Sequence, residues 1–379
     1  MILTQRQEQG LKTVLKKYND GEKYCVISGY AGTGKSTLVK FIIEALSSYG
    51  INPDIDVVYT TYTGKAAQVL LKKGNKNVMT LHKLLYDSFP RQDGTFFHKP
   101  KPLIEYKVVI VDEVSMAPRT LIELLFKHNV FIIALGDPFQ LPPVDKDQDN
   151  GLLMKPDVFL DEIMRQSLES EIIQLSMKIR HQEPIAYRHG TDVIVMEKKE
   201  LNTGVLRWAD QILVATNTTR VAINNQMRDL LGRGGKPESG DKVICLHNYW
   251  DILADNGDPL VNGTIGFIDN MYETYNQLPR WASGKKIQVL NADFTSDSNA
   301  YFGRLSMDEK QILTGEKAID YKESYKLMKN YRTRHLIPMD FTYAYAITTH
   351  KSQGSSWPNV LVLEEKFPFI REEHARWLY

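Results

Sequence analysis

The stretch GYAGTGKST, residues 29–37, follows the apolar run 24–28 and decides how the chain is interpreted. Its spacing meets the pattern G-x-x-x-x-G-K-[ST], in which backbone N–H groups and a helix N-terminus cradle phosphates. We expect the lysine to meet the outer phosphates and the following serine to hold Mg²⁺. A turn that merely joins a strand to a helix is the alternative. The predicted nucleotide-binding residues here are Gly29, Gly32, Thr33, Gly34, Lys35, Ser36 and Thr37.

Bulk composition is that of a folded protein with more than one domain. The 379 residues are 42% hydrophobic and 25% charged, and the net charge is only +1. Any nucleic-acid contact must therefore come from a local groove. With two cysteines, no secretory signal pattern and no run of about 18 apolar residues, we expect a soluble cytoplasmic chain without a membrane partner.

Alternating strand and helix patterns predict an α/β fold with a doubly wound parallel sheet. Helical spacing follows Thr4 and the phosphate loop, and strands are expected at 55–61, 108–111 and 130–135. The pattern begins again near Glu169, with strands at 192–196 and 211–215 and a helix at 218–231. Strand-like runs at 265–268, 286–290 and 301–305 predict a β-rich insert within residues 263–339, and the α/β pattern returns at 341–348.

Two carboxylates end the buried run 108–111. Asp112 is placed to hold Mg²⁺, and Glu113 to deprotonate an attacking water. A solvated strand end is the alternative, which the preceding phosphate loop disfavours. Gln140 follows the next strand, where a polar side chain can sense the terminal phosphate.

A basic segment carries aromatic residues. Between Lys65 and Lys107 there are nine basic side chains and three acidic ones. Within it, residues 91–97 place Asp-Gly at a hairpin turn beside Phe96 and Phe97. These rings could press against a base pair, or could simply be packed inward.

The motif series resembles the superfamily 1 DNA helicases of the 5′-to-3′ branch, of the RecD and phage Dda types. The motifs are LTQRQ, GYAGTGKST, TYTGKAAQ, MTLHKLL, VDEVSM, GDPFQLPPV, IMRQS, ATNTTR, NGTIG and ITTHKSQGSS, in the family's order. The resemblance implies that Gln7 reads adenine, that Gln140 couples nucleotide to DNA, and that Arg165 reaches the γ-phosphate. It also implies DNA contacts at Thr61, Thr63, Lys65, Thr80, His82, Phe96, Phe97, Asn217, Arg220, Thr348, His350, Lys351 and Gln353.

The same resemblance implies two RecA-like lobes with ATP and Mg²⁺ between them. The first lobe would comprise 1–85 and 102–165, with a pin hairpin at 86–101. The second would comprise 166–262 and 340–379, with an SH3-like insert at 263–339. The implied activity is ATP-dependent 5′-to-3′ translocation on single-stranded DNA with duplex unwinding. Single-stranded DNA and strand junctions are the expected partners of a monomer, and the family does not say which replication or recombination proteins join it.

Three positions depart from the family pattern. Tyr62 replaces a proline, Ser356 stands where relatives carry Glu, and the sequence stops at Tyr379, where a T-R-A motif would supply a second arginine to the γ-phosphate. Loss of such an arginine costs about 10³ to 10⁵ in turnover. A shortened sequence or slow hydrolysis would both account for this. Two other functions therefore stay open: a nucleotide-gated single-strand binder, and a P-loop NTPase acting on another substrate.

Overall fold

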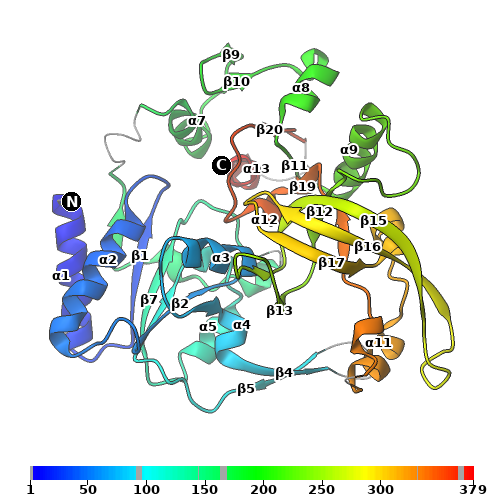
Figure 1. The fold of residues 1–379 in the computed structure, drawn as a ribbon. Coiled ribbons are helices and arrows are strands. Elements are labelled where there is room, and N and C mark those ends of the chain that lie inside the picture. The colour runs from blue at the N-terminus through cyan, green and yellow to red at the C-terminus, as the bar shows by residue number, and fades with distance from the viewer. Residues whose placement is uncertain (1–2, 91–95, 144, 163–168, 331, 366–370) are drawn as a thin grey trace.

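The computed structural model describes residues 3–90, 96–143, 145–162, 169–330, 332–365 and 371–379. Its largest sheet has six parallel strands in the order β3-β2-β6-β7-β1-β8 (Figure 1). These strands are β1 (Tyr24–Gly29), β2 (Val57–Thr61), β3 (Val78–Thr80), β6 (Val108–Val111), β7 (Phe131–Gly136) and β8 (Val158–Leu160). The predicted α/β fold is confirmed. Because the phosphate loop follows β1 and the two acids follow β6, both lie at the carboxyl edge of one sheet.

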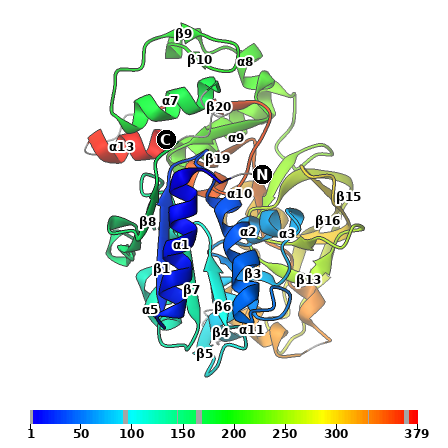
Figure 2. The same ribbon diagram turned by 90° about the vertical axis from the view of Figure 1, so that its left-hand side faces the viewer.

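Helices cover both faces of this sheet. On one face α1 (Gln5–Asn19) and α2 (Lys35–Leu46) lie side by side, as Figure 2 shows, and bury Val14, Leu38 and Ile42 against the strands. The other face is covered by α4 (Leu81–Leu85) and α5 (Arg119–Leu125). Each buried aliphatic side chain of this kind contributes about 1.5–3 kcal/mol. The sheet is thus held rigid from both sides, which fixes the loops at its edge.

Two elements of the first lobe leave the sheet. The helix α3 (Gly64–Lys72) follows β2 and begins at the Thr63 cap. The strands β4 (Tyr86–Pro90) and β5 (Phe96–Pro100) pair antiparallel at the lower edge of Figure 1, and Phe89 lies opposite Phe97. The predicted Asp-Gly turn and the side chains of Phe96 and Phe97 lie outside the described residues.

A second parallel sheet has the order β19-β11-β20. Helices α8 and α9 pack on it through Leu206 and Met227. The strand predicted at 211–215 and the helix predicted at 218–231 agree with the observed β11 and α9 to within a few residues. The elements of this part are α7 (Glu171–Arg180), β9 (Arg188–His189), β10 (Ile194–Val195), α8 (Thr203–Trp208), β11 (Gln211–Val214), α9 (Asn217–Leu230), β19 (Ala346–Thr348), α12 (Thr349–Ser352), β20 (Val360–Val362) and α13 (Arg371–Leu378).

The β-rich part forms a five-stranded antiparallel sheet in the order β17-β16-β15-β12-β18. Its elements are β12 (Lys242–Cys245), β13 (Tyr249–Leu253), β14 (Pro259–Leu260), β15 (Ile265–Gln277), β16 (Lys286–Ser296), β17 (Tyr301–Met307), α10 (Glu309–Thr314), α11 (Tyr321–Met328) and β18 (Phe341–Tyr343). Phe294, Phe302 and Phe341 share its core. Two of the five strands, β12 and β18, come from outside the range 263–339 expected for the insert, so this sheet and the second lobe are continuous.

Candidate nucleotide cleft and nucleic-acid track

The phosphate loop has the backbone that its glycines allow. Gly32 and Gly34 have φ of 76° and 80°, in the left-handed region that favours glycine. A Cβ on Gly29 would lie 2.8 Å from the carbonyl oxygen of Leu160, so a larger residue would displace β8. The loop therefore leaves an open cradle at the start of α2, as phosphate binding requires.

Side chains of the loop are held by its own carbonyl groups. The Lys35 ammonium donates to the carbonyl oxygens of Gly29 at 2.6 Å and Tyr30 at 3.0 Å. The buried Thr33 hydroxyl also donates to Tyr30, at 2.8 Å. These bonds keep the lysine over the cradle, while Ser36 and Thr37 lie in the first turn of α2.

The two acids lie at the end of β6. Glu113 has a positive φ of 52°, a strained conformation that costs about 1–3 kcal/mol. The Asp112 carboxylate accepts the Glu113 N–H at 3.0 Å. Burial raises the pKa of both groups, and the Asp112 charge adds to the effect on Glu113, whose pKa reaches about 7. Among the described residues, the Glu113 Oε2 has no hydrogen-bond partner.

These residues fit a magnesium ion bound with a nucleotide. Ser36 and Asp112 line one small cavity of about 40 Å³, and they supply one hydroxyl and one carboxylate oxygen. Within the described ranges no group of three or more His, Cys, Asp or Glu side chains could hold a metal. Mg²⁺ that is completed by waters and substrate phosphates needs no such cage.

Three further residues were predicted to contact the nucleotide, and the structure describes two of them, Gln7 and Gln140. Gln7 is 1% exposed; its carbonyl accepts Thr4 N–H at 3.0 Å, and its amide donates to Thr33 at 3.3 Å. It therefore ties α1 to the phosphate loop, and adenine reading stays a prediction. Gln140 follows the buried Asp137 in the loop after β7. Arg165 lies outside the described residues.

Two contacts with the phosphate loop were not foreseen from the sequence. The Arg180 guanidinium, at the end of α7, lies 3.5 Å from the centre of the Tyr30 ring. The Tyr379 hydroxyl accepts Ala31 N–H at 3.2 Å and donates to Asp137 at 2.6 Å. No motif marks either side chain, because both reach the loop only through the packing of α7 and α13.

Predicted DNA residues of the first lobe gather at the starts of α3 and α4. Thr63 and Thr80 cap these helices, accepting N–H groups at 3.2 and 3.3 Å, and the Thr61 hydroxyl donates to Thr63 at 2.8 Å. His82 lies between the rings of Tyr62 and Tyr86, and burial lowers its pKa. The threonines thus have an established structural role, and their DNA contacts stay predictions.

Predicted DNA residues of the second lobe lie at the starts of α9 and α12. The Arg220 guanidinium donates to Asn217 at 3.1 Å, and burial lowers its pKa. Burial also lowers the pKa of His350 and of Lys351, and the Arg220 charge adds to the effect on the lysine. Gln353 carries a buried Oε1 without a hydrogen-bond partner in the described part of the chain, and Thr348 precedes α12 as its cap residue.

Glu365 holds the start of α9 in place, a role that the sequence did not predict. Its carboxylate accepts the N–H groups of Ala215 and Thr216, at 2.5 and 3.0 Å, and the hydroxyls of Thr216 and Thr219. It therefore anchors the start of α9, where Asn217 and Arg220 lie. A lone glutamate 146 residues from Thr219 carries no local signal of this role.

The two groups meet at α3. A Cβ on Gly354, whose φ is +78°, would lie 3.2 Å from the Ala66 Cβ. A Cβ on Gly263, in the NGTIG turn, would likewise lie 3.3 Å from the Lys65 Cβ. Burial lowers the pKa of the Lys65 ammonium between them. Residues 66 and 354, and residues 65 and 263, which are far apart in the sequence, thus lie side by side, and a DNA track across both lobes stays a prediction.

Comparison with known families agrees with this geometry. Residues 2–195, just over half of the chain, match the model of an AAA domain. This chain belongs to the AAA-domain family. Residues 343–379 of this AAA-domain chain match a UvrD-like helicase C-terminal domain. The resemblance to superfamily 1 helicases of the 5′-to-3′ branch is thereby confirmed.

Two of the relatives that the chain matches are ATP-dependent DNA helicases. The chain is 32% identical over 157 residues to the ATP-dependent DNA helicase dda of phage T4, covering 40% of this chain and 35% of that protein. It is 27% identical to the ATP-dependent RecD2 DNA helicase of Deinococcus radiodurans, covering 91% and 44%. It therefore spans less than half the length of these relatives. The crystal structure of Pif1 helicase from Candida albicans superimposes with a TM-score of 0.54 at 20% identity, covering 100% of this chain and 92% of that one, which shows the shared fold.

Among the described residues, no helix has the length and apolar character to cross a membrane.

Proposed function

We propose that the chain is the motor of an ATP-dependent DNA helicase that moves 5′-to-3′ on single-stranded DNA and unwinds duplex ahead of it. One observation carries this proposal: the half-buried acids Asp112 and Glu113 share a cavity with residues 354–357 of the second lobe, shortly after α12. Nucleotide chemistry and the predicted DNA track therefore border one cleft. The division into two lobes, a pin at 86–101 and an SH3-like insert at 263–339 is part of the proposal.

Hydrolysis would proceed by in-line attack of water on the γ-phosphate. Glu113 takes a proton from the water, a new O–P bond forms, and the bond from phosphorus to the bridging oxygen breaks to release ADP. Lys35 binds the outer phosphates, with Gln140 and Arg165 at the γ-phosphate. Ser36 and Asp112 would hold Mg²⁺, which neutralises charge on the β- and γ-phosphates when bound.

Movement would follow from closure of the cleft. The start of α3 carries Lys65 on the DNA side, and its end carries Lys73 beside the acids, so one rigid helix connects the two sites. ATP closes the lobes, the DNA contacts shift along one strand, and release of products reopens the cleft. The contact of Gly354 with Ala66 is the point where both lobes meet this helix.

Strand displacement on 5′-tailed and 3′-tailed duplexes tests the proposal. We expect ATP-dependent unwinding of the 5′-tailed duplex only, its loss in Lys35→Ala, and its retention in Lys12→Ala on the exposed face of α1. Single-strand binding should survive in both variants. Binding without phosphate release would favour a nucleotide-gated binder, and ATP hydrolysis that single-stranded DNA does not stimulate would favour another NTPase; either result contradicts the helicase.

A further inference from the structure

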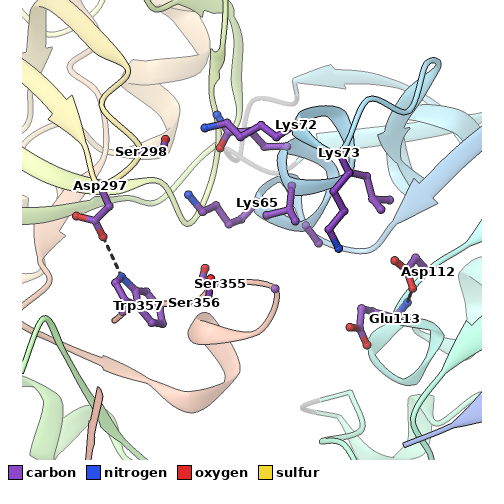
Figure 3. A pocket seen from close by; sticks show the side chains of 15 residues that line it. Lys65, Lys72, Lys73, Asp112, Glu113, Asp297, Ser298, Ser355, Ser356 and Trp357 are labelled. Carbon is purple, nitrogen blue, oxygen red and sulfur yellow. Dashed lines mark hydrogen bonds between the residues drawn. The ribbon is translucent and has the colours of Figure 1, made fainter. Parts of the chain in front are cut away.

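A large cavity lies behind the two acids. It has a volume of about 460 Å³ and is bounded by α3, by Asp112 and Glu113, by Asp297 and Ser298, and by residues 354–357 (Figure 3). Three lysines of the first lobe, Lys65, Lys72 and Lys73, line it. The proposed nucleotide and DNA contacts use residues at the edges of this cavity. They assign no ligand to its interior.

The positive charges of this cavity are only partly neutralised. Lys72 lies 3.1 Å from Asp258. Asp297 accepts the Trp357 indole N–H at 2.9 Å, on the opposite wall. In the described part of the chain no carboxylate lies within 4 Å of the ammonium of Lys65 or Lys73. These two cations are thus available to an anion that enters the cavity.

Uncharged donors line the same cavity. Gln68 is 2% exposed, and its Oε1 has no hydrogen-bond partner among the described residues. The buried Ser355 hydroxyl also has no hydrogen-bond partner among the described residues. Because an amide can present its NH₂ group after a half-turn, and a hydroxyl rotates freely, both can donate to an oxyanion. Burying such groups without a hydrogen-bond partner is unfavourable, and a bound ligand would remove that cost.

The cavity continues to the phosphate loop. The small cavity at Ser36 shares Leu70, Lys73 and Asp112 with the large one. Lys73 therefore stands between the position expected for the γ-phosphate and the larger space. Figure 3 shows its side chain reaching down beside Asp112 and Glu113, while Lys65 extends toward Asp297 and Trp357.

We propose that this cavity is an oxyanion site that receives inorganic phosphate after hydrolysis and through which phosphate leaves the cleft, with Lys73 at its entrance. This inference rests on the proposed ATP hydrolysis. Lys73, Gln68 and Ser355 offer the newly formed phosphate dianion hydrogen-bond donors on the far side of the two acids. The cleft could then stay closed around ADP while phosphate departs.

Direct binding tests the site without turnover. Inorganic phosphate is titrated with the protein, without nucleotide or DNA, and observed by ³¹P NMR line broadening. We expect binding that Lys73→Gln weakens about tenfold, the worth of one charge-assisted hydrogen bond. The matched control is Lys76→Gln, which removes the same charge from an ammonium 2.7 Å from Asp54, outside the cavity. No binding, or equal binding by all three proteins, would overturn the site.

Kinetics test the exit. Quenched-flow measures ATP cleavage and a fluorescent phosphate sensor measures release. In Lys73→Gln we expect release to slow about tenfold relative to cleavage, so that a burst of bound phosphate builds up. Cleavage and release slowed together would place Lys73 in the chemical step. Weaker single-strand DNA binding with unchanged release would mean that the cavity holds a DNA phosphate; either result overturns the exit. A wild-type chain without ATP hydrolysis would refute the proposed function, and the NMR titration would still decide the site.

Discussion

Glu113 is the residue whose surroundings suit its predicted role most closely. It follows a fully buried strand, its backbone is left-handed, and its carboxylate Oε2 has no hydrogen-bond partner in the described structure. Such a carboxylate is available to a water molecule rather than to the protein. These features follow from the position of β6 in the sheet.

Glu113→Gln should bind ATP and lower DNA-stimulated phosphate release by about 10²- to 10⁴-fold, the contribution of a general base. The physical reason is that the amide keeps the shape of the side chain and cannot accept the proton. Steady-state phosphate release and binding of a fluorescent ATP analogue measure the two effects. Glu123→Gln, on the exposed face of α5, should change neither. Hydrolysis at the wild-type rate would assign water activation to another group.

Glu365 determines stability rather than chemistry. The bonds from Thr219, Ala215 and Thr216 outweigh the effect of burial, so the pKa of Glu365 lies below its usual value. A carboxyl group with a lowered folded-state pKa stabilises the fold fully above the unfolded value of about 4.3, and that stabilisation disappears as the pH falls through the folded-state pKa. Its contribution should therefore be present at neutral pH and lost in acid.

Glu365→Gln should lower the free energy of unfolding by about 1–3 kcal/mol at pH 7, because N–H and hydroxyl donors of α9 lose a charged acceptor. The difference from wild type should shrink once the pH is below about 4. Urea midpoints at several pH values measure it. The neighbouring Glu364→Gln is the control, since its carboxylate is 59% exposed and 3.3 Å from His374, and such a pair is worth about 0–1 kcal/mol. Equal losses in both variants would contradict the anchoring role.

At the scale of elements, the β4–β5 hairpin projects from the first lobe without joining either large sheet. It pairs five residues on each side, from Tyr86 opposite Pro100 to Pro90 opposite Phe96. An element held in this way is available to act on a strand junction rather than to support the core. The predicted pin role depends on the rings at its tip.

Phe96→Ala and Phe97→Ala should reduce duplex unwinding at least about fivefold, since stacking of one base on an aromatic ring is worth about 1–3 kcal/mol. Translocation on single strands should be nearly unchanged, because no base pair is opened there. Strand displacement and streptavidin displacement from single-stranded DNA compare the two activities. Tyr49→Ala, which removes an exposed ring elsewhere in the first lobe, is the control. Equal loss of both activities would indicate a packing role for the phenylalanines.

At the scale of the molecule, a net charge of +1 leaves no general attraction for DNA. The structure gathers positive side chains instead at the starts of α3, α9 and α12, where burial lowers the pKa of Lys65, Arg220 and Lys351. DNA phosphates that bind along the predicted track would replace the water that these cations lose on burial. Binding should therefore depend on salt and hardly on base identity.

Lys351→Gln should reduce the slope of log binding constant against log salt by about 0.7, the value for one phosphate contact on a single strand. Fluorescence titrations with labelled oligonucleotides at several salt concentrations measure the slope. Lys76→Gln should leave it unchanged, since this lysine is paired with Asp54 on the exposed surface. A slope that stays at the wild-type value in Lys351→Gln would place that lysine outside the track.

The sequence alone determined the features that depend on local spacing: the parallel α/β fold, the phosphate loop of 29–37, the acids 112–113 and the start of each long strand of the β-rich part. Such features are set by neighbours within one or two turns, which periodicity and turn residues report. Only the tertiary structure decided that β12 and β18 complete the antiparallel sheet, that Arg180 reaches Tyr30, that Glu365 anchors α9 and that Lys73 borders both cavities. These contacts join residues from distant elements, and their positions depend on how whole sheets and helices pack, which no local pattern records.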